Sequence, residues 1–129
     1  KTGYFHYGIK AFWLDAAEPE QMTGTPAGSA WSVGSVQRVG MMFPWYHTKT
    51  YHDGMRAAGV GDGLTLSRSA WAGMSKHRAV LWNGDTRSRF EDLGAAIRAG
   101  QSAQLSGIAW WTTDIGGYAG GDPSDPTFR

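Results

Sequence analysis

The sequence predicts an α/β fold built on a parallel sheet. Short apolar runs that end in a charged residue alternate with longer segments of helical periodicity, and this alternation is typical of strands joined by crossover helices. The chain has 129 residues, which suits one domain, and 41% of them are hydrophobic, so a packed core can offset the entropy lost on folding. We therefore expect one domain over residues 1–129.

The first strand and the first helix are predicted in the N-terminal half. Residues 9–14 (IKAFWL) carry bulky apolar side chains on both faces, which indicates a strand covered on both sides. Residues 22–42 are rich in Gly, Ser and Thr without a period, so we expect a long loop there. Residues 43–58 are predicted to form a helix, because Pro44 suits a first turn and Gly59 suits a C-terminal stop.

Three further strands are predicted at residues 64–67 (LTLS), 78–82 (RAVLW) and 108–112 (IAWWT). The connection between the first two of them has about ten residues, which is near the lower limit for a crossover between parallel strands. This connection is the weakest point of the predicted parallel order.

A second helix is predicted over residues 88–102. Phe90, Leu93 and Ile97 are three and four residues apart, as expected for the apolar face of a helix, and Ser88 is a suitable N-cap. This helix places a crossover between the last two predicted strands.

Each of the four predicted strands is followed by a charged residue. These residues are Asp15, Arg68, Asp85 and Asp114. In parallel α/β folds, catalytic groups project from the carboxyl edge of the sheet, where the loops can approach a substrate. Charged residues also mark strand ends simply because the chain enters solvent there, but this explanation fits one position better than four. We expect these side chains to gather around one site.

Four of the seven tryptophans lie near the same strand ends, at Trp13, Trp82, Trp110 and Trp111. The flat apolar face of an indole can stack on the C–H face of a sugar ring, although tryptophan more often packs in a core. We expect Trp13 and Trp82 to contact a ligand, and at least one of Trp110 and Trp111 to lie in the core.

Asp15 and Asp85 form a pair that suits glycoside hydrolysis. In that reaction one carboxylate attacks the anomeric carbon and the other carboxyl group protonates the leaving oxygen. The acid needs an apolar setting to hold its proton, and Leu81 and Trp82 precede Asp85. Arg68 is the nearest candidate to keep Asp15 ionised.

Several other partners are disfavoured. The formal net charge of +1 provides no field that would attract nucleic acid, and no apolar run approaches the roughly 20 residues of a membrane span. His47 and His52 are five residues apart and do not share a helical face, so no metal site is expected. The absence of cysteine leaves the compartment open, with the cytoplasm favoured over the outside.

Four segments resemble motifs of glycoside hydrolase family 31, the retaining α-glucosidases and α-xylosidases. Residues 12–20 (FWLDAAEPE) are similar to the nucleophile signature, and residues 81–85 (LWNGD) to the acid/base segment. Residues 67–73 (SRSAWAG) resemble the Arg-Ser stretch, and residues 106–118 (SGIAWWTTDIGGY) the motif of strand seven. Their order and spacing span nearly the whole chain, which makes the resemblance specific.

The resemblance implies a role for each matching residue. Asp15 would be the nucleophile and Asp85 the acid/base, while Arg68 and Trp82 would bind the sugar in the minus-one subsite and Asp114 would line the floor of the pocket. The implied fold is a (β/α)₈ TIM barrel, of which this chain would form roughly strands four to seven. The family uses no metal and no organic cofactor.

The implied function is that of a retaining exo-α-glycosidase, which hydrolyses terminal α-linked sugars of α-glucosides or α-xylosides by double displacement. Two alternatives stay open. The chain could be a non-catalytic carbohydrate-binding or structural fragment, or the same pocket could serve an α-transglycosylase or an α-glucan lyase.

The length departs from the resemblance, because a (β/α)₈ barrel needs about 250 residues. The family's hydroxyl-binding Asp on an earlier strand and its His on the last strand also match nothing in these 129 residues. Four strands of a barrel would have two unpaired edges. We therefore expect the remainder of the barrel to come from a longer parent chain, and this piece alone to be inactive and either unstable or self-associating.

Overall fold

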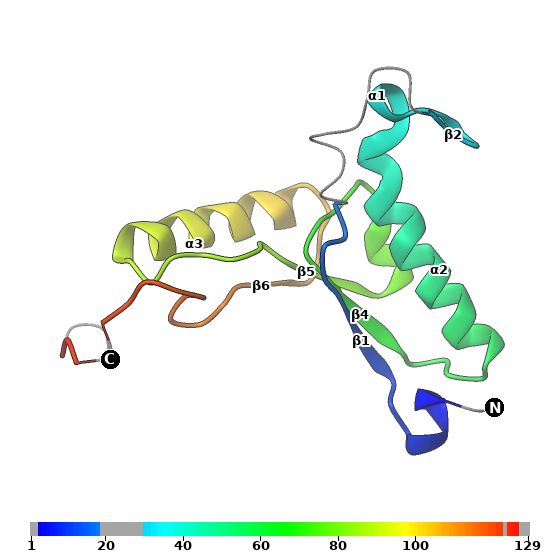
Figure 1. Cartoon of the computed structure of the whole chain (residues 1–129), viewed down its shortest axis with the longest axis horizontal. Coiled ribbons are helices and arrows are strands. Elements are labelled where there is room, and N and C mark those ends of the chain that lie inside the picture. Colours follow the sequence, from blue (N-terminus) through cyan, green and yellow to red (C-terminus); the bar gives the residue numbers. More distant parts are fainter. Residues whose placement is uncertain (1–2, 19–29, 123, 127–129) are drawn as a thin grey trace.

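A four-stranded parallel sheet organises the computed structural model, which describes residues 3–18, 30–122 and 124–126 (Figure 1). The strand order is β1–β4–β5–β6, and every pair is parallel. The strands are β1 (Ala11–Leu14), β4 (Leu64–Ser67), β5 (Ala79–Trp82) and β6 (Trp111–Thr112). The predicted α/β fold is confirmed, and the described residues form an open sheet instead of a closed barrel.

The register brings the carboxyl ends of the strands to one edge. Leu14, the last residue of β1, lies opposite Ser67, the last residue of β4. Ser67 in turn lies opposite Leu81, and Trp82 lies opposite Thr112 at the end of β6. The residues that follow the four strands therefore leave the sheet on the same side.

Two long helices flank the sheet on separate arms of the molecule (Figure 1). The helix α2 (Phe43–Ala57) packs against β4, and α3 (Phe90–Leu105) packs against β6. The short helices η1 (Tyr4–Tyr7) and η4 (Met74–His77) precede β1 and β5. No helix within the described ranges is long and apolar enough to span a membrane.

The predicted loop over residues 22–42 is wrong for its second half. Residues 22–29 lie outside the described residues. The others form an antiparallel pair and two short helices, namely β2 (Ala30–Trp31), β3 (Gly34–Ser35), α1 (Val36–Val39) and η3 (Gly40–Met42). Elements of two to four residues are too short to produce a hydrophobic period, so the sequence pattern does not reveal them.

The start of α3 differs from the prediction. The helix begins at Phe90 after the N-cap residue Arg89, and no side chain caps it. The backbone N–H of Ser88 donates instead to the carbonyl oxygen of Ala119, at 2.9 Å. A long-range backbone contact therefore holds Ser88 outside the helix, and the predicted N-cap at Ser88 is wrong.

The apolar stripe of α3 is exposed. Phe90, Leu93 and Ile97 expose 68%, 50% and 55% of their surface. In β1, which we expected to be covered on both sides, Leu14 is buried but Trp13 is 65% exposed. The described residues leave at least half of each of these four side chains exposed, whereas apolar stripes of this kind normally pack against a neighbour.

The core between α2 and η4 contains a buried histidine. His77 is 4% exposed, its ring packs edge-on against Trp45, and its Nδ1 lies 3.5 Å from the hydroxyl of Thr48. Burial lowers the pKa of His77 because it disfavours the charged imidazolium, and the nearby Lys76 lowers the pKa further. Both effects favour the neutral imidazole of His77 in the folded protein.

This burial predicts a loss of stability in mild acid. The unfolded chain binds a proton at His77 more readily than the folded chain, so the free energy of unfolding should fall as the pH drops below about 6.5. Urea denaturation at several pH values measures this slope. We expect His77→Gln to make this slope shallower, with the rest of the slope coming from groups such as His47, whose pKa burial also lowers. An equal slope in wild type and His77→Gln would contradict the assignment.

Candidate active site

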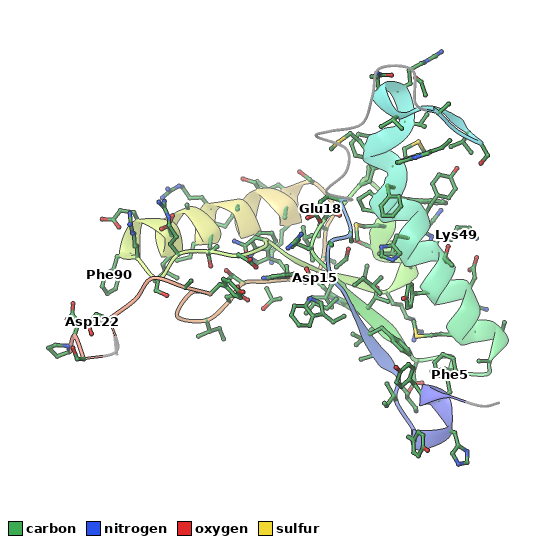
Figure 2. The ribbon with its side chains drawn as sticks, viewed as in Figure 1. Phe5, Asp15, Glu18, Lys49, Phe90 and Asp122 are labelled. Atoms are coloured by element: carbon green, nitrogen blue, oxygen red, sulfur yellow. The ribbon has the colours of Figure 1, made fainter. Side chains whose placement is uncertain are left out.

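Asp15 is held at the end of β1 by two donors. Nη1 of Arg68 lies 3.3 Å from Oδ1 of Asp15, and the backbone N–H of Ala16 donates to the same oxygen at 2.8 Å. Nη2 of Arg68 also forms an ion pair with Glu18. Asp15 and Glu18 lie side by side where the two arms of the molecule meet (Figure 2). The side chain of Asp15 is 52% exposed, so its carboxylate is both oriented and accessible.

The backbone at Ala16 is strained. Its φ is +49°, in the left-handed region that residues other than glycine rarely adopt. The N–H of the same residue donates to the carboxylate of Asp15. Strain of this kind persists only where surrounding packing enforces it, and the next residue, Ala17, is fully buried.

Arg68 also contacts the segment that leads to Asp85. Its guanidinium carbon lies 5.9 Å from the centroid of the Trp82 ring, and its side-chain carbons lie 3.7 Å from where a Cβ would stand on Gly84. Trp82 packs edge-on against Trp13, with ring centroids 5.6 Å apart. Arg68 therefore links the end of β1 to the residue immediately before Asp85.

Asp85 lies outside this cluster of direct contacts and is exposed. Leu81 and Trp82, which we expected to provide its apolar setting, are buried within β5, at 8% and 5% exposure. The described residues therefore leave the carboxyl group of Asp85 open to solvent, and the expected apolar enclosure is not present among them.

The tryptophans near the strand ends differ in how far they are buried. Trp13 projects into solvent, whereas Trp82 is buried and its indole nitrogen has no hydrogen-bond partner in the described structure. Trp111 packs on α3, where a Cβ on Gly100 would come within 2.6 Å of its indole nitrogen. Trp110 is 50% exposed. Trp111 thus serves helix packing, while Trp82 offers a donor at the carboxyl edge.

Buried polar atoms without a hydrogen-bond partner gather at this edge. The described residues contain eight such side-chain atoms, and six belong to residues at or just after strand ends: Glu18, Ser69, Trp82, Asn83, Thr113 and Asp114. Buried polar groups in native proteins are nearly always paired, so a cluster of unpaired ones calls for an explanation. These six atoms can therefore accept or donate hydrogen bonds to a partner outside the described residues.

A separate cavity of about 240 Å³ lies beside the start of α3. Its walls include Asp114, Gly117, Ser88 and Phe90. The lining residues do not include Asp15, Arg68, Trp82 or Asp85. Asp114 is therefore the one predicted site residue that lines the cavity. The contacts of Arg68, and not this cavity, join the other predicted site residues.

Sequence reasoning missed Glu18 as a member of the site. Glu18 follows Asp15 by three residues, pairs with Arg68 and leaves its second carboxylate oxygen buried without a partner. The sequence feature that could have indicated it is that Glu18 is the second acidic residue of the FWLDAAEPE segment. Because Arg68 and Glu18 are 50 residues apart, only the fold shows that they pair.

No metal-binding cluster was found in the part of the chain that the structure describes. It contains no group of three or more His, Asp or Glu side chains arranged to hold an ion. The rings of His52 and His77 are 5.8 Å apart, and His77 packs with Trp45 and Thr48 in the α2–η4 core. His77 therefore belongs to the packing of that core.

Comparison with known proteins decides the family. Residues 1–128 match the model of the glycosyl hydrolases family 31 TIM-barrel domain. The chain belongs to glycosyl hydrolase family 31. The resemblance to this family is thereby confirmed, and the parallel strands of this family 31 chain are part of a TIM-barrel domain.

Curated relatives of this family 31 chain are much longer than it is. It is 41% identical over 129 residues to an uncharacterized family 31 glucosidase of Pseudescherichia vulneris, covering 100% of the chain and 24% of that protein. It is 35% identical over 131 residues to an α-xylosidase of Saccharolobus solfataricus, covering 98% of the chain and 18% of that protein. The chain thus spans about a quarter or less of the length of these relatives.

Solved structures agree with the fold. A family 31 α-xylosidase from a soil metagenome, complexed with xylose, superposes with a TM-score of 0.86 at 41% identity, covering 97% of this chain and 18% of that one. An α-xylosidase of Xanthomonas citri gives 0.81 at 31% identity, covering 95% and 14%. The open sheet described above therefore has the backbone of the matching part of complete enzymes.

Proposed function

We propose that residues 1–129 form the central part of the catalytic barrel of a retaining exo-α-glycosidase, which removes a terminal α-linked xylose or glucose unit. Family membership and relatives named α-xylosidase and α-glucosidase support this substrate class. The observation that carries the proposal is the position of Arg68. Its one side chain contacts Asp15 after β1 and lies beside Gly84 immediately before Asp85, so it links the two candidate catalytic acids.

The proposed reaction has two steps. Asp15 attacks the anomeric carbon while Asp85 donates a proton to the departing glycosidic oxygen, so that a covalent glycosyl ester forms on Asp15 and the leaving group is released as an alcohol. Asp85 then removes a proton from water, which attacks the same carbon and breaks the ester. Two inversions give a sugar with retained configuration and restore both acids.

The remaining candidates would hold the sugar. The Arg68 guanidinium and the unpartnered Oδ2 of Asp114 can hydrogen-bond hydroxyl groups, as can the unpartnered indole N–H of Trp82. Trp13 presents an exposed indole face beside Trp82 for contact with the ring carbons. We propose no metal and no organic cofactor, because proton transfer and covalent catalysis by two carboxyl groups complete the reaction.

The remainder of the barrel is a necessary partner in this proposal. Among the residues that the structure describes, the outer strands β1 and β6 each have a neighbour on one side only, and the apolar stripe of α3 is exposed. In a closed barrel both strands would be paired, and further helices would cover such stripes. The isolated 129 residues are therefore expected to lack activity, and the catalytic unit is the parent chain.

The experiment that tests this function is stereochemical. The full-length protein is incubated with an aryl α-xyloside and an aryl α-glucoside, and the first anomer released is identified by NMR before mutarotation. Release of the α-anomer supports the proposal, whereas release of the β-anomer, or binding without turnover, contradicts it.

The same products separate hydrolysis from transfer. One relative, 29% identical over 87 residues, is an isomaltosyltransferase of Sporosarcina globispora. An added sugar acceptor would be converted into a new glycoside by a transferase, and an unsaturated sugar would reveal a lyase. We expect free sugar to remain the main product.

A further inference from the structure

We propose that Gly117 is a positioning residue for the acid/base Asp85, because it lets the loop after β6 lie directly against the segment that follows Asp85. The inference rests on the proposed function and deepens it, since it explains how the loops after β5 and β6 are held together.

Backbone hydrogen bonds join the two loops. The N–H of Tyr118 donates to the carbonyl oxygen of Thr86 at 2.8 Å, and the N–H of Ser88 donates to the carbonyl oxygen of Ala119 at 2.9 Å. Arg87 and Ala119 form a parallel β-bridge between these bonds. The two loops therefore pair with each other beyond the ends of β5 and β6.

The loops approach most closely at Gly117. A Cβ atom on this residue would lie 2.6 Å from the backbone nitrogen, the Cα and the hydroxyl oxygen of Ser88. Two of these three atoms belong to the backbone, so rotation of the Ser88 side chain cannot relieve the clash. Any larger residue at position 117 must push the paired loops apart.

Asp85 stands between two anchored neighbours. On one side Gly84 lies against Arg68, and on the other side Thr86 is bonded to Tyr118. Displacing Thr86 therefore displaces Asp85 relative to Arg68 and to Asp15. Asp114 begins the paired loop, and its carbonyl oxygen accepts the N–H of Gly117 at 3.0 Å. The pairing thus also sets the separation of Asp85 from Asp114.

Gly116 supplies a matched control. Its φ is +86° and that of Gly117 is +88°, so alanine is equally strained at both positions. A Cβ on Gly116, however, would meet no atom within 4 Å. Comparing Gly117→Ala with Gly116→Ala therefore separates the loss of the close approach from the cost of a left-handed alanine.

The test uses the full-length protein and two substrates, one with a poor alkyl or sugar leaving group and one with an activated aryl leaving group. Because a displacement of about 1 Å can cost about 100-fold in rate, we expect Gly117→Ala to lower kcat/KM about 100-fold on the poor substrate. The loss on the activated substrate should be only a few-fold, because that leaving group needs little protonation. Gly116→Ala should affect both substrates equally and mildly.

Hydrogen exchange supplies a readout that needs no activity. The amides of Ser88 and Tyr118 should exchange slowly in the wild type and in Gly116→Ala, and rapidly in Gly117→Ala. Should Gly117→Ala fail to fold, as judged by circular dichroism, Tyr118→Pro removes the bond to Thr86 without adding an atom at Gly117, and the same substrate split is expected.

The outcomes separate the two proposals. A wild type that hydrolyses neither substrate contradicts the proposed function, while the exchange experiment still tests the pairing of the loops. If the wild type is active, any of three results would overturn the role of Gly117. The first is an equal loss of kcat/KM on both substrates in Gly117→Ala, and the second is the same difference between substrates in Gly116→Ala. The third is an unchanged exchange rate of the Ser88 and Tyr118 amides in Gly117→Ala.

Discussion

Replacing Asp15 by alanine is expected to abolish turnover, lowering kcat by on the order of 10⁴-fold or more, as removal of a catalytic nucleophile typically does. The variant keeps the acid Asp85 but has no group that can form the covalent intermediate. Steady-state kinetics on an aryl α-glycoside with the full-length protein measure the loss. Asp53→Ala is the matched control, because Asp53 is an exposed aspartate on α2 that pairs with Lys49.

Azide distinguishes a missing nucleophile from a misfolded protein. A small anion that enters the space left by the Asp15 side chain can attack the anomeric carbon once, and a single inversion gives the β-glycosyl azide. We expect azide to restore turnover of an activated aryl substrate in Asp15→Ala. A variant that retains wild-type activity would exclude Asp15 as the nucleophile.

Replacing Asp85 by alanine is expected to slow the enzyme according to its leaving group. A general acid contributes about 10²- to 10⁴-fold, and a loss of this size should appear with alkyl or disaccharide substrates, which leave as poor alkoxides without a proton. Activated aryl substrates leave readily as phenolates and should form the glycosyl intermediate at a nearly unchanged rate. A plot of log(kcat/KM) against leaving-group pKa measures the effect.

The same plot also shows the result that would contradict the acid role of Asp85. A steeper slope in Asp85→Ala than in the wild type supports the acid role, whereas parallel lines would mean that Asp85 does not protonate the leaving group. Asp122→Ala controls for loss of an exposed carboxylate, since the hydrogen bonds described for Asp122 are with Ser124. This control should leave the slope unchanged.

The local elements of the fold were predictable because their signals are local. The β4 segment is bounded by turn residues and is found over the predicted range, and α2 begins at the predicted residue with Pro44 in its first turn. The weak crossover between β4 and β5 is parallel as predicted, with η4 in the connection. The prediction failed where an element was too short to give a pattern, as in β2 and β3. It also failed where the structure depends on residues distant in sequence, as at the start of α3.

The candidate site was predictable only as a set of residues. Asp15, Arg68, Asp85 and Asp114 could be selected from sequence because each follows a strand, and parallel strands end at a common edge. Sequence did not reveal that Arg68 is shared between Asp15 and Glu18, or that it also lies over Trp82. Such contacts depend on side-chain directions at strands far apart in the chain.

By itself, the sequence determined where the four strands of the parallel sheet lie, which charged residues follow them, and the family to which the chain belongs, because hydrophobic runs and motif spacing are properties of neighbouring residues. Only the tertiary structure decided that Ser88 pairs with the loop at Gly117 instead of capping α3, and that Phe90, Leu93 and Ile97 are uncovered. The reason is physical: close approach and burial are set by atoms distant in sequence, whose positions no local pattern encodes.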